Sequence, residues 1–166
     1  MPTFSTQTLE RIHEIIKHYP EGRQKSAILP VLHLAQREFG GHLSTETMDY
    51  VASILQILPV EVYEVATFYS MYNLNPVGRY VLEVCRTGPC CLVGAEKIMQ
   101  YIEHKLGIKE GETTPDGMFT LKPMECLGSC GTGPVLQILE KFYENLTEER
   151  VDEIIAECRA KTAGLN

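Results

Sequence analysis

The sequence predicts an α+β protein in which an N-terminal helical bundle, residues 1–78, precedes a small mixed domain, residues 79–166. Three observations lead to this prediction. Apolar residues recur at helical spacing in the first part, whereas short extended segments alternate with helical ones in the second. All six cysteines lie after residue 78. The stretch 73–78, Asn-Leu-Asn-Pro-Val-Gly, is rich in turn-forming residues and marks the expected boundary.

Four helices are expected in the first part. They are a helix from Ser5 or Thr6 to Tyr19, one from about Gln24 to Phe39, one from Ser44 or Thr45 through Leu55, and one from Val60 to about Tyr72. Pro30 lies inside the second helix and predicts a kink or a broken first turn. Pro59 suits the first turn of the fourth helix.

The second part is expected to alternate strands and helices. The expected elements are a strand Arg79–Val84, a helix over residues 92–105, strands Phe119–Pro123 and Pro134–Leu139, and a last helix capped by Thr147. This β-α-β-β-α order around a small sheet is compatible with a thioredoxin-like domain that lacks one or more peripheral elements.

The composition of the 166-residue chain excludes several classes of protein. Hydrophobic residues at 44% and charged residues at 22% exclude a disordered or low-complexity chain. A net charge of −7 disfavours a nucleic-acid partner, which requires a basic surface. No apolar run approaches the ~20 residues of a membrane span, so we expect no direct membrane insertion. The N-terminus lacks the pattern of a secretory signal, which predicts a cytoplasmic protein or a mature form whose leader was removed.

Four of the six cysteines form two pairs. Cys85 and Cys90 are separated by four residues. After 35 further residues, Cys126 and Cys130 follow, separated by three. Each pair comes directly after a predicted strand, so four thiolates on two loops can surround one metal centre. In a cytoplasmic protein, such cysteines are more often ligands, redox centres or core thiols than disulfides.

The spacing favours a [2Fe–2S] cluster, because such a cluster needs two ligand pairs, one for each iron. Zinc sites with four cysteines usually have two-residue gaps, so gaps of four and three residues are less typical of zinc. Gly88, Gly128 and Gly131 are suited to let backbone N–H groups approach the sulfurs. From the spacing alone, zinc and redox-active or buried thiols stay open as alternatives.

Three segments around the cysteines carry a specific pattern: Val84–Cys90, Leu106–Gly117 and Glu125–Cys130. They resemble the thioredoxin-like [2Fe–2S] subunits of respiratory complex I, the E subunits of bacterial NADH–quinone oxidoreductase. In the first part, Leu29–Gln36 and Val62–Tyr69 are similar to the helical region of that family. The resemblance covers nearly the whole sequence, from about residue 10 to residue 160.

The resemblance implies an electron-transfer subunit with four iron ligands. By analogy with the family, Cys85 and Cys90 hold one iron of a [2Fe–2S] cluster, and Cys126 and Cys130 hold the other. FMN and NADH would bind to a partner, the flavoprotein (F) subunit of complex I, in a heterodimer within the peripheral arm. The cluster would accept one electron from the reduced flavin. No catalytic residue and no independent turnover are expected of this chain alone.

The family also implies a location and a docking region. The protein is expected in the cytoplasm, peripheral to the inner membrane through the complex, or on the matrix side in a mitochondrion. The flavoprotein would dock near the domain boundary, where the aromatic and methionine side chains of 68–72 fit either a core or a partner surface. Related subunits occur in bidirectional hydrogenases and NAD-linked formate dehydrogenases, so the resemblance identifies the module better than the parent complex.

Three residues near the cysteine pairs or in the last helix complete the expectations. Cys91 could compete as a ligand, but the four-residue gap of the family favours Cys90 and leaves Cys91 buried at the start of the next helix. Cys158 recurs with apolar residues at helical spacing and is expected in the core. Pro134 directly precedes a predicted strand and is expected to be cis, as in thioredoxin-like folds.

Two other interpretations are weaker. Residues 44–70 resemble a helix-turn-helix in their spacing, which would suit a metal-stabilised regulator that binds DNA. However, residues 42–78 contain no Lys or Arg and four acidic residues, which would repel phosphate. A free homodimeric thioredoxin-like ferredoxin would have a longer gap in the first cysteine pair and usually no helical N-terminal domain.

Overall fold

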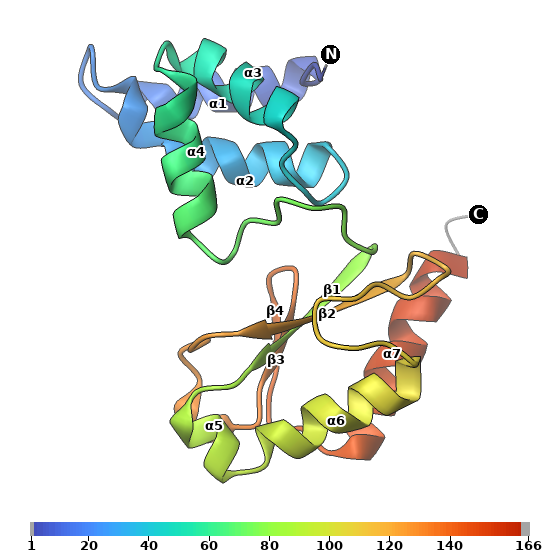
Figure 1. The fold of residues 1–166 in the computed structure, drawn as a ribbon. Helices are drawn as coiled ribbons and strands as arrows, with labels where there is room; N and C mark the ends of the chain where they lie inside the picture. Colours follow the sequence, from blue (N-terminus) through green and yellow to red (C-terminus); the bar gives the residue numbers. More distant parts are fainter. Residues whose placement is uncertain (1, 164–166) are drawn as a thin grey trace. The chain divides into compact units, whose positions relative to one another are not determined.

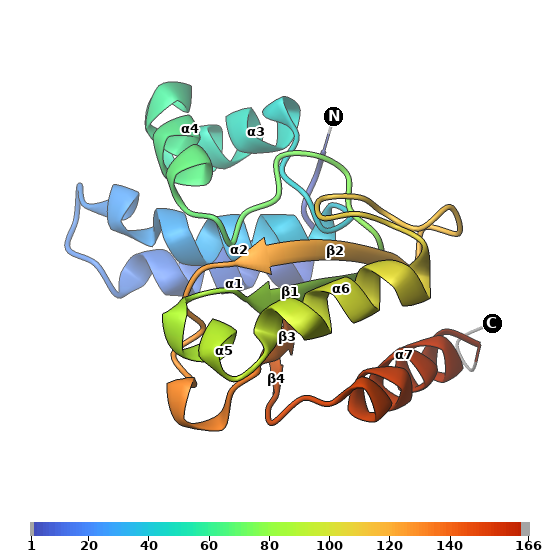
Figure 2. The ribbon, with the colours of Figure 1, turned by 60° about the horizontal axis from the view of Figure 1, so that its bottom comes forward.

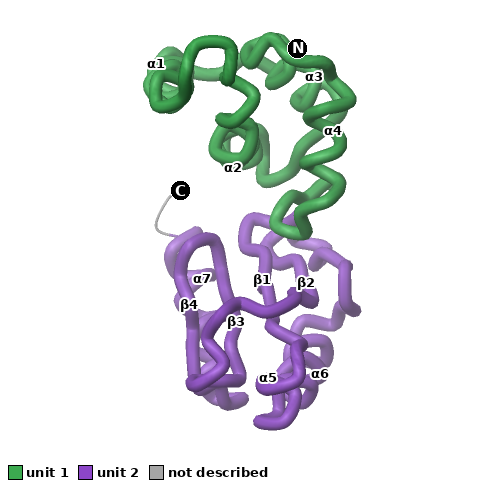
Figure 3. The backbone as a smooth tube through the Cα atoms, turned by 90° about the vertical axis from the view of Figure 1, so that its left-hand side faces the viewer, with its two compact units in different colours: residues 1–76 green, residues 77–166 purple. Residues whose placement is uncertain are grey.

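The computed structural model describes residues 2–163, and contacts divide the protein into two compact units, Met1–Pro76 and Val77–Asn166 (Figure 3). The expected domain boundary, after residue 78, lies two residues further along the sequence. Within residues 2–163, no helix has both the length and the apolar character needed to cross a membrane.

The first unit consists of helices (Figure 1). Its elements are α1 (Thr6–Lys17), the 3₁₀ turn η1 (Gln24–Ala27), α2 (Ile28–Glu38), α3 (Thr45–Leu55) and α4 (Pro59–Phe68). Ile12, Leu32 and Leu55 are fully buried in a core that these helices share. The four predicted helices are therefore present, each with its apolar stripe turned inward.

Local signals start these helices where they were expected. The Ser5 Oγ accepts a hydrogen bond from the Thr8 N–H at 3.3 Å, and the Ser44 Oγ accepts one from the Thr47 N–H at 3.2 Å. Both serines are N-caps, which satisfy backbone donors of the first turn. Pro30 lies in the first turn of α2, directly after η1, so the predicted broken first turn is confirmed.

The fourth helix ends at Phe68, four residues before its predicted end. The backbone becomes extended at Tyr69, with φ −90° and ψ 117°, and then turns back toward α2. There the Tyr72 hydroxyl donates a hydrogen bond to the carbonyl oxygen of Leu29 at 2.9 Å. Tyr72 is consequently buried, whereas the Phe68 side chain is 79% exposed. The aromatic segment thus supplies both core and surface.

The second unit is built on a four-stranded sheet with the order β2-β1-β3-β4 (Figure 2). Its strands are β1 (Tyr80–Cys85), β2 (Phe119–Met124), β3 (Leu136–Ile138) and β4 (Lys141–Tyr143). Its helices are α5 (Gly88–Leu92), α6 (Ala95–Leu106) and α7 (Glu148–Ala163). Strands β1 and β2 are parallel, whereas β3 is antiparallel to β1 and to β4. The predicted α+β fold class is confirmed.

One core holds this second unit together. Leu82 and Val84 alternate along β1 and are both buried. They belong to the same apolar cluster as Ile102 of α6 and Ile154 of α7. The helices therefore pack on the sheet through the side chains that the periodicity of the sequence indicates.

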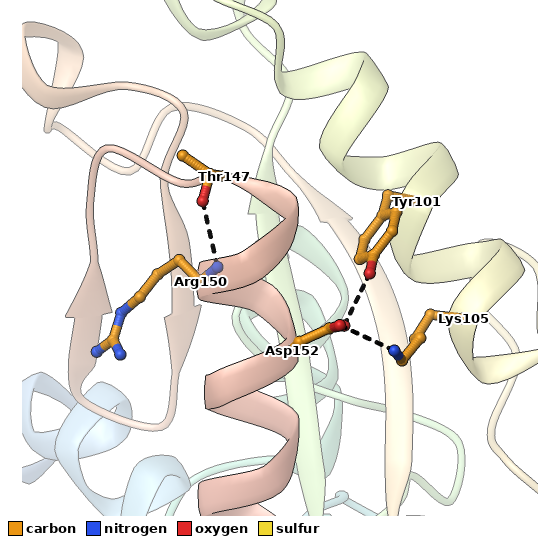
Figure 4. A network of polar contacts seen from close by, with 5 residues as sticks. All are labelled: Tyr101, Lys105, Thr147, Arg150 and Asp152. Atoms are coloured by element: carbon orange, nitrogen blue, oxygen red, sulfur yellow. Dashed lines mark hydrogen bonds and ion pairs between the residues drawn. The ribbon is translucent and has the colours of Figure 1, made fainter.

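Polar contacts also join α6 to α7 (Figure 4). The Asp152 carboxylate accepts hydrogen bonds from the Tyr101 hydroxyl and the Lys105 ammonium group, each at 2.9 Å. Because Lys105 and Asp152 are partly exposed, solvent screens their ion pair and its contribution to stability is small. The Thr147 Oγ1 accepts a hydrogen bond from the backbone N–H of Arg150 at 3.2 Å, so the predicted cap of α7 is confirmed.

Two details of the second unit differ from the expectation. The helix expected over residues 92–105 is α6, which begins at Ala95; the separate short helix α5 precedes it, and Gly94, with a left-handed backbone and φ 103°, lies between them. The sequence does not predict β4, because three residues are too few to reveal alternation of polar and apolar side chains. The observed order is therefore β-α-α-β-β-β-α.

A glycine is required where the second unit begins. The Gly78 N–H donates a hydrogen bond to the Thr120 Oγ1 at 2.6 Å. A Cβ on Gly78 would lie 2.9 Å from the carbonyl carbon of Phe119 and 3.1 Å from the carbonyl oxygen of Gly117. Both are backbone atoms and cannot rotate away from an added methyl group.

The substitution Gly78→Ala should therefore lower the free energy of unfolding by about 1–3 kcal/mol, measured by urea denaturation of the metal-free protein. Gly131→Ala is the matched control, because nothing lies within 4 Å of its added Cβ and its backbone is not left-handed. The control should leave stability unchanged or slightly raised. Equal stability of the two variants would contradict the close approach of the Gly78 backbone to Phe119 and Gly117.

Candidate metal centre

The parallel pairing of β1 and β2 brings both cysteine loops to one edge of the sheet. Cys85, the last residue of β1, lies opposite Met124, the last residue of β2. The Arg86 N–H continues this pairing with a hydrogen bond to the carbonyl oxygen of Met124 at 3.0 Å. Cys126 follows two residues after β2. Because the carboxyl ends of parallel strands share an edge, the two loops leave the sheet side by side.

The first cysteine pair is buried. Cys85 and Cys90 expose 2% and 1% of their surface, and they pack against Ala95 at the start of α6. Cys90 is held on α5, which directly follows the loop after β1. Leu127, from the loop of the second pair, packs against the same small cluster. The two loops are therefore in contact through an apolar side chain.

The second cysteine pair is exposed. The Sγ atoms of Cys126 and Cys130 are 4.0 Å apart, and Cys130 begins the short 3₁₀ turn η2 (Cys130–Thr132). Among residues 2–163, no three Cys, His, Asp or Glu side chains gather so as to hold a single metal ion. The thiols therefore lie as two pairs, one buried and one exposed.

Surroundings set different pKa values for the buried thiols. Burial raises the pKa of Cys85, but hydrogen bonds from the Thr87 hydroxyl and from the Thr87 and Leu127 amides outweigh burial and lower it. Burial raises the pKa of Cys90 to about 11, and the neighbouring Cys85 adds to that rise. Metal ligation requires thiolates, so a metal held by these two residues would displace protons from them.

Backbone donors and a missing side chain shape the space around the sulfurs. The Gly128 N–H donates a hydrogen bond to the Cys126 Sγ at 3.3 Å, and its φ of 78° is a conformation that suits glycine. A Cβ on Gly133 would lie 3.2 Å from the Cys90 Sγ and 3.0 Å from the Val93 Cγ2. The absence of that Cβ leaves room beside a predicted ligand. Two thiol pairs with such donors fit a [2Fe–2S] cluster, whose negative charge needs them.

Only some of these neighbours are predictable from the sequence. Of the three glycines expected to approach the sulfurs, Gly128 makes such a hydrogen bond. The sequence does not predict the contacts of Thr87, Leu127 and Gly133 with the cysteines. Thr87 could have been found, because a hydroxyl two residues after a ligand can turn back to its sulfur. The role of Gly133 depends on its approach to Cys90, which lies far away in the sequence.

The predictions for Cys91, Cys158 and Pro134 can be compared with the structure. Neighbouring residues on a helix point about 100° apart, so when Cys90 faces inward Cys91 faces outward. The expectation of a buried Cys91 is therefore wrong: it is exposed, and its thiol donates a hydrogen bond to the carbonyl oxygen of Arg86 at 3.1 Å. Cys158 is buried in the core, as predicted. The Gly133–Pro134 peptide bond is cis, as predicted.

Comparisons with known proteins agree with this geometry. The family model of the thioredoxin-like [2Fe-2S] ferredoxins matches residues 12–159. The E subunit of the NADH-quinone oxidoreductase of Rickettsia felis is 50% identical over 155 residues, which are 93% of this chain and 93% of that protein. This chain belongs to the family of those subunits, among the thioredoxin-like [2Fe-2S] ferredoxins. The corresponding subunit of Rickettsia prowazekii is 48% identical over 152 residues, 92% of this chain and 86% of that protein.

Solved structures share the fold. An NAD+-reducing [NiFe]-hydrogenase in the H2-reduced state matches 80% of this chain with a TM-score of 0.69 and 20% sequence identity. The matched part is 22% of that longer polypeptide, so this chain spans about a fifth of it. At this identity the similarity concerns the fold alone. The family membership predicted from the cysteine motifs is confirmed by the family model and the sequence relatives.

The burial of the thiols predicts two classes of reactivity in the metal-free protein. The exposed class is Cys91, Cys126 and Cys130, and the buried class is Cys85, Cys90 and Cys158. Iodoacetamide at about pH 8 should modify the exposed class in the folded protein, and the buried class only after unfolding in urea. Mass spectrometry of the labelled peptides measures the order. Labelling of Cys90 as early as Cys91 would show that Cys90 does not face inward.

Proposed function

We propose that this chain is the electron-transfer subunit of an NADH–quinone oxidoreductase and that it holds one [2Fe–2S] cluster. The proposed ligands are Cys85 and Cys90 for one iron and Cys126 and Cys130 for the other. The observation that carries the proposal is the arrival of both cysteine loops at one edge of the parallel strands β1 and β2. Membership of the family of NADH-quinone oxidoreductase E subunits supports it.

The protein's own groups prepare the site. When bound, the cluster supplies one-electron redox chemistry. The buried first pair excludes water from one side, which strengthens hydrogen bonds to the sulfurs. The Thr87 hydroxyl and the Leu127 amide favour the thiolate of Cys85, and the Gly128 amide donates a hydrogen bond to the Cys126 Sγ. These donors offset the negative charge that four thiolates bring together.

We further propose a partner that binds FMN and NADH, the flavoprotein (F) subunit, in a heterodimer within the peripheral arm of the complex. The sequence has no G-x-G-x-x-G fingerprint between a strand and a helix, which supports binding of both cofactors by the partner. The reduced flavin would deliver one of its two electrons to the cluster. Leu92 and Val93, 90% and 55% exposed next to Cys90, suit contact with a protein. The complex would lie at the cytoplasmic face of the membrane, or at the matrix face in a mitochondrion.

Four variants test the ligand assignment in protein purified and reconstituted without oxygen. Cys85→Ala and Cys126→Ala should abolish the visible iron–sulfur absorption, because each removes one ligand atom and leaves an iron without its full set of thiolates. Cys91→Ser and Cys158→Ser are the controls and should keep bands that bleach with dithionite. Absorption that persists in Cys126→Ala, or that is lost in Cys91→Ser, would contradict the assignment. A colourless wild-type protein with one zinc ion per molecule would contradict the proposed electron-transfer function.

A further inference from the structure

Glu144 attaches the loop of the exposed cysteine pair, Cys126 and Cys130, to the sheet of the second unit. This pair is called the outer pair below, and the buried pair, Cys85 and Cys90, the inner pair. It directly follows β4, and its Oε1 accepts hydrogen bonds from the hydroxyl groups of Ser129 and Thr132, the latter at 2.5 Å. Ser129 immediately precedes Cys130, and Thr132 ends η2. A single carboxylate oxygen therefore holds both sides of the turn that carries the fourth proposed ligand.

Backbone contacts continue this attachment toward the core. The Asn145 N–H donates to the carbonyl oxygen of Thr132 at 2.7 Å, and the Leu146 N–H donates to that of Pro134 at 3.1 Å. Leu146 is 4% exposed and belongs to the core of the second unit. The segment 144–146 thus contacts the loop of the exposed cysteine pair through Glu144 and Asn145, and it is anchored in the core through Leu146.

The outer loop depends on this attachment more than the inner one does. The first cysteine pair is buried, whereas Cys126 and Cys130 are exposed. Gly128 and Gly131 give the outer loop conformational freedom that it must lose to hold a ligand in place. The hydrogen bond from Gly128 to Cys126 lies within the loop and does not connect it to the sheet.

The charge of Glu144 suits its role as an acceptor. Hydrogen bonds from Ser129 and from Thr132 lower the pKa of its carboxyl group. The group is therefore ionised at neutral pH and has no proton of its own to donate. Hydrogen bonds to an ionised acceptor are shorter and stronger than those between neutral groups.

We propose that Glu144 is a positioning residue for the iron–sulfur site: by binding both hydroxyl groups it keeps the Cys126–Cys130 turn in the geometry that retains the outer iron. This inference rests on the proposed function. Without the carboxylate the turn opens, and iron is lost from the outer pair while the buried pair keeps its place.

The rate of iron loss tests the proposal. Wild-type protein and variants, loaded with the cluster, are mixed with excess EDTA without oxygen, and the decay of the visible absorption is recorded. Glu144→Ala should lose its absorption roughly tenfold faster than the wild type. Glu144→Gln keeps an oxygen acceptor at the same position but removes its charge, so its rate should lie between those of the wild type and Glu144→Ala. Glu96→Ala, which removes an exposed carboxylate from α6, should change nothing.

Removal of the two hydroxyl donors, Ser129 and Thr132, provides an independent test of the proposal. The double variant Ser129→Ala/Thr132→Val should accelerate iron loss as much as Glu144→Ala does. Addition of Glu144→Ala to that pair should have no further effect, because all three side chains act in one contact. Multiplied effects in the triple variant, or equal acceleration by Glu144→Ala and Glu144→Gln, would overturn the role of Glu144 as a hydrogen-bond acceptor for this turn.

Hydrogen–deuterium exchange of the metal-free protein separates this inference from the proposed function. In Glu144→Ala, amides of residues 128–132 should exchange faster, whereas those of β1 should not change. Unchanged exchange in the turn, or faster exchange in both regions, would overturn a positioning role. A wild-type protein that never acquires the cluster would contradict the proposed function, and the exchange experiment would still decide whether Glu144 holds the turn.

Discussion

The parallel pairing of β1 with β2 is the constraint on which the rest of the structure depends. It sets Cys85 opposite Met124, so the backbone leaves both strands at the same edge of the sheet. Parallel strands need a crossover connection, which here contains α5 and α6. An antiparallel pairing would place the two cysteine loops at opposite ends of the sheet. The site therefore follows from the topology, and the cysteine spacing has meaning only within it.

The two cysteine pairs obtain their positions by different physical means. The inner pair is fixed by burial, because Cys85 belongs to a central strand and Cys90 packs on α5 against Ala95. The outer pair lies at the surface on a loop rich in glycine and is fixed by polar contacts with Glu144. In the proposed metal site, the buried pair would exclude water from one side and the exposed pair would face solvent on the other.

Features of the fold and the site that depend on neighbouring residues were predictable from the sequence. The caps at Ser5 and Ser44, the helices that follow them, and the spacing within each cysteine pair are of this kind. Features that depend on distant segments were not. The absence of a side chain at Gly133 matters only because Cys90 approaches it. The contact of Glu144 with the outer loop requires β4, a strand too short to predict.

The position of iron tests the central claim most directly: two irons, each held by one cysteine pair. Crystals of the protein, purified and grown without oxygen, would be measured with X-rays above and below the iron and the zinc absorption edges. Two iron peaks per molecule are expected, one beside the sulfurs of Cys85 and Cys90 and one beside those of Cys126 and Cys130. A single peak among all four sulfurs, or one that appears only at the zinc edge, would contradict the claim.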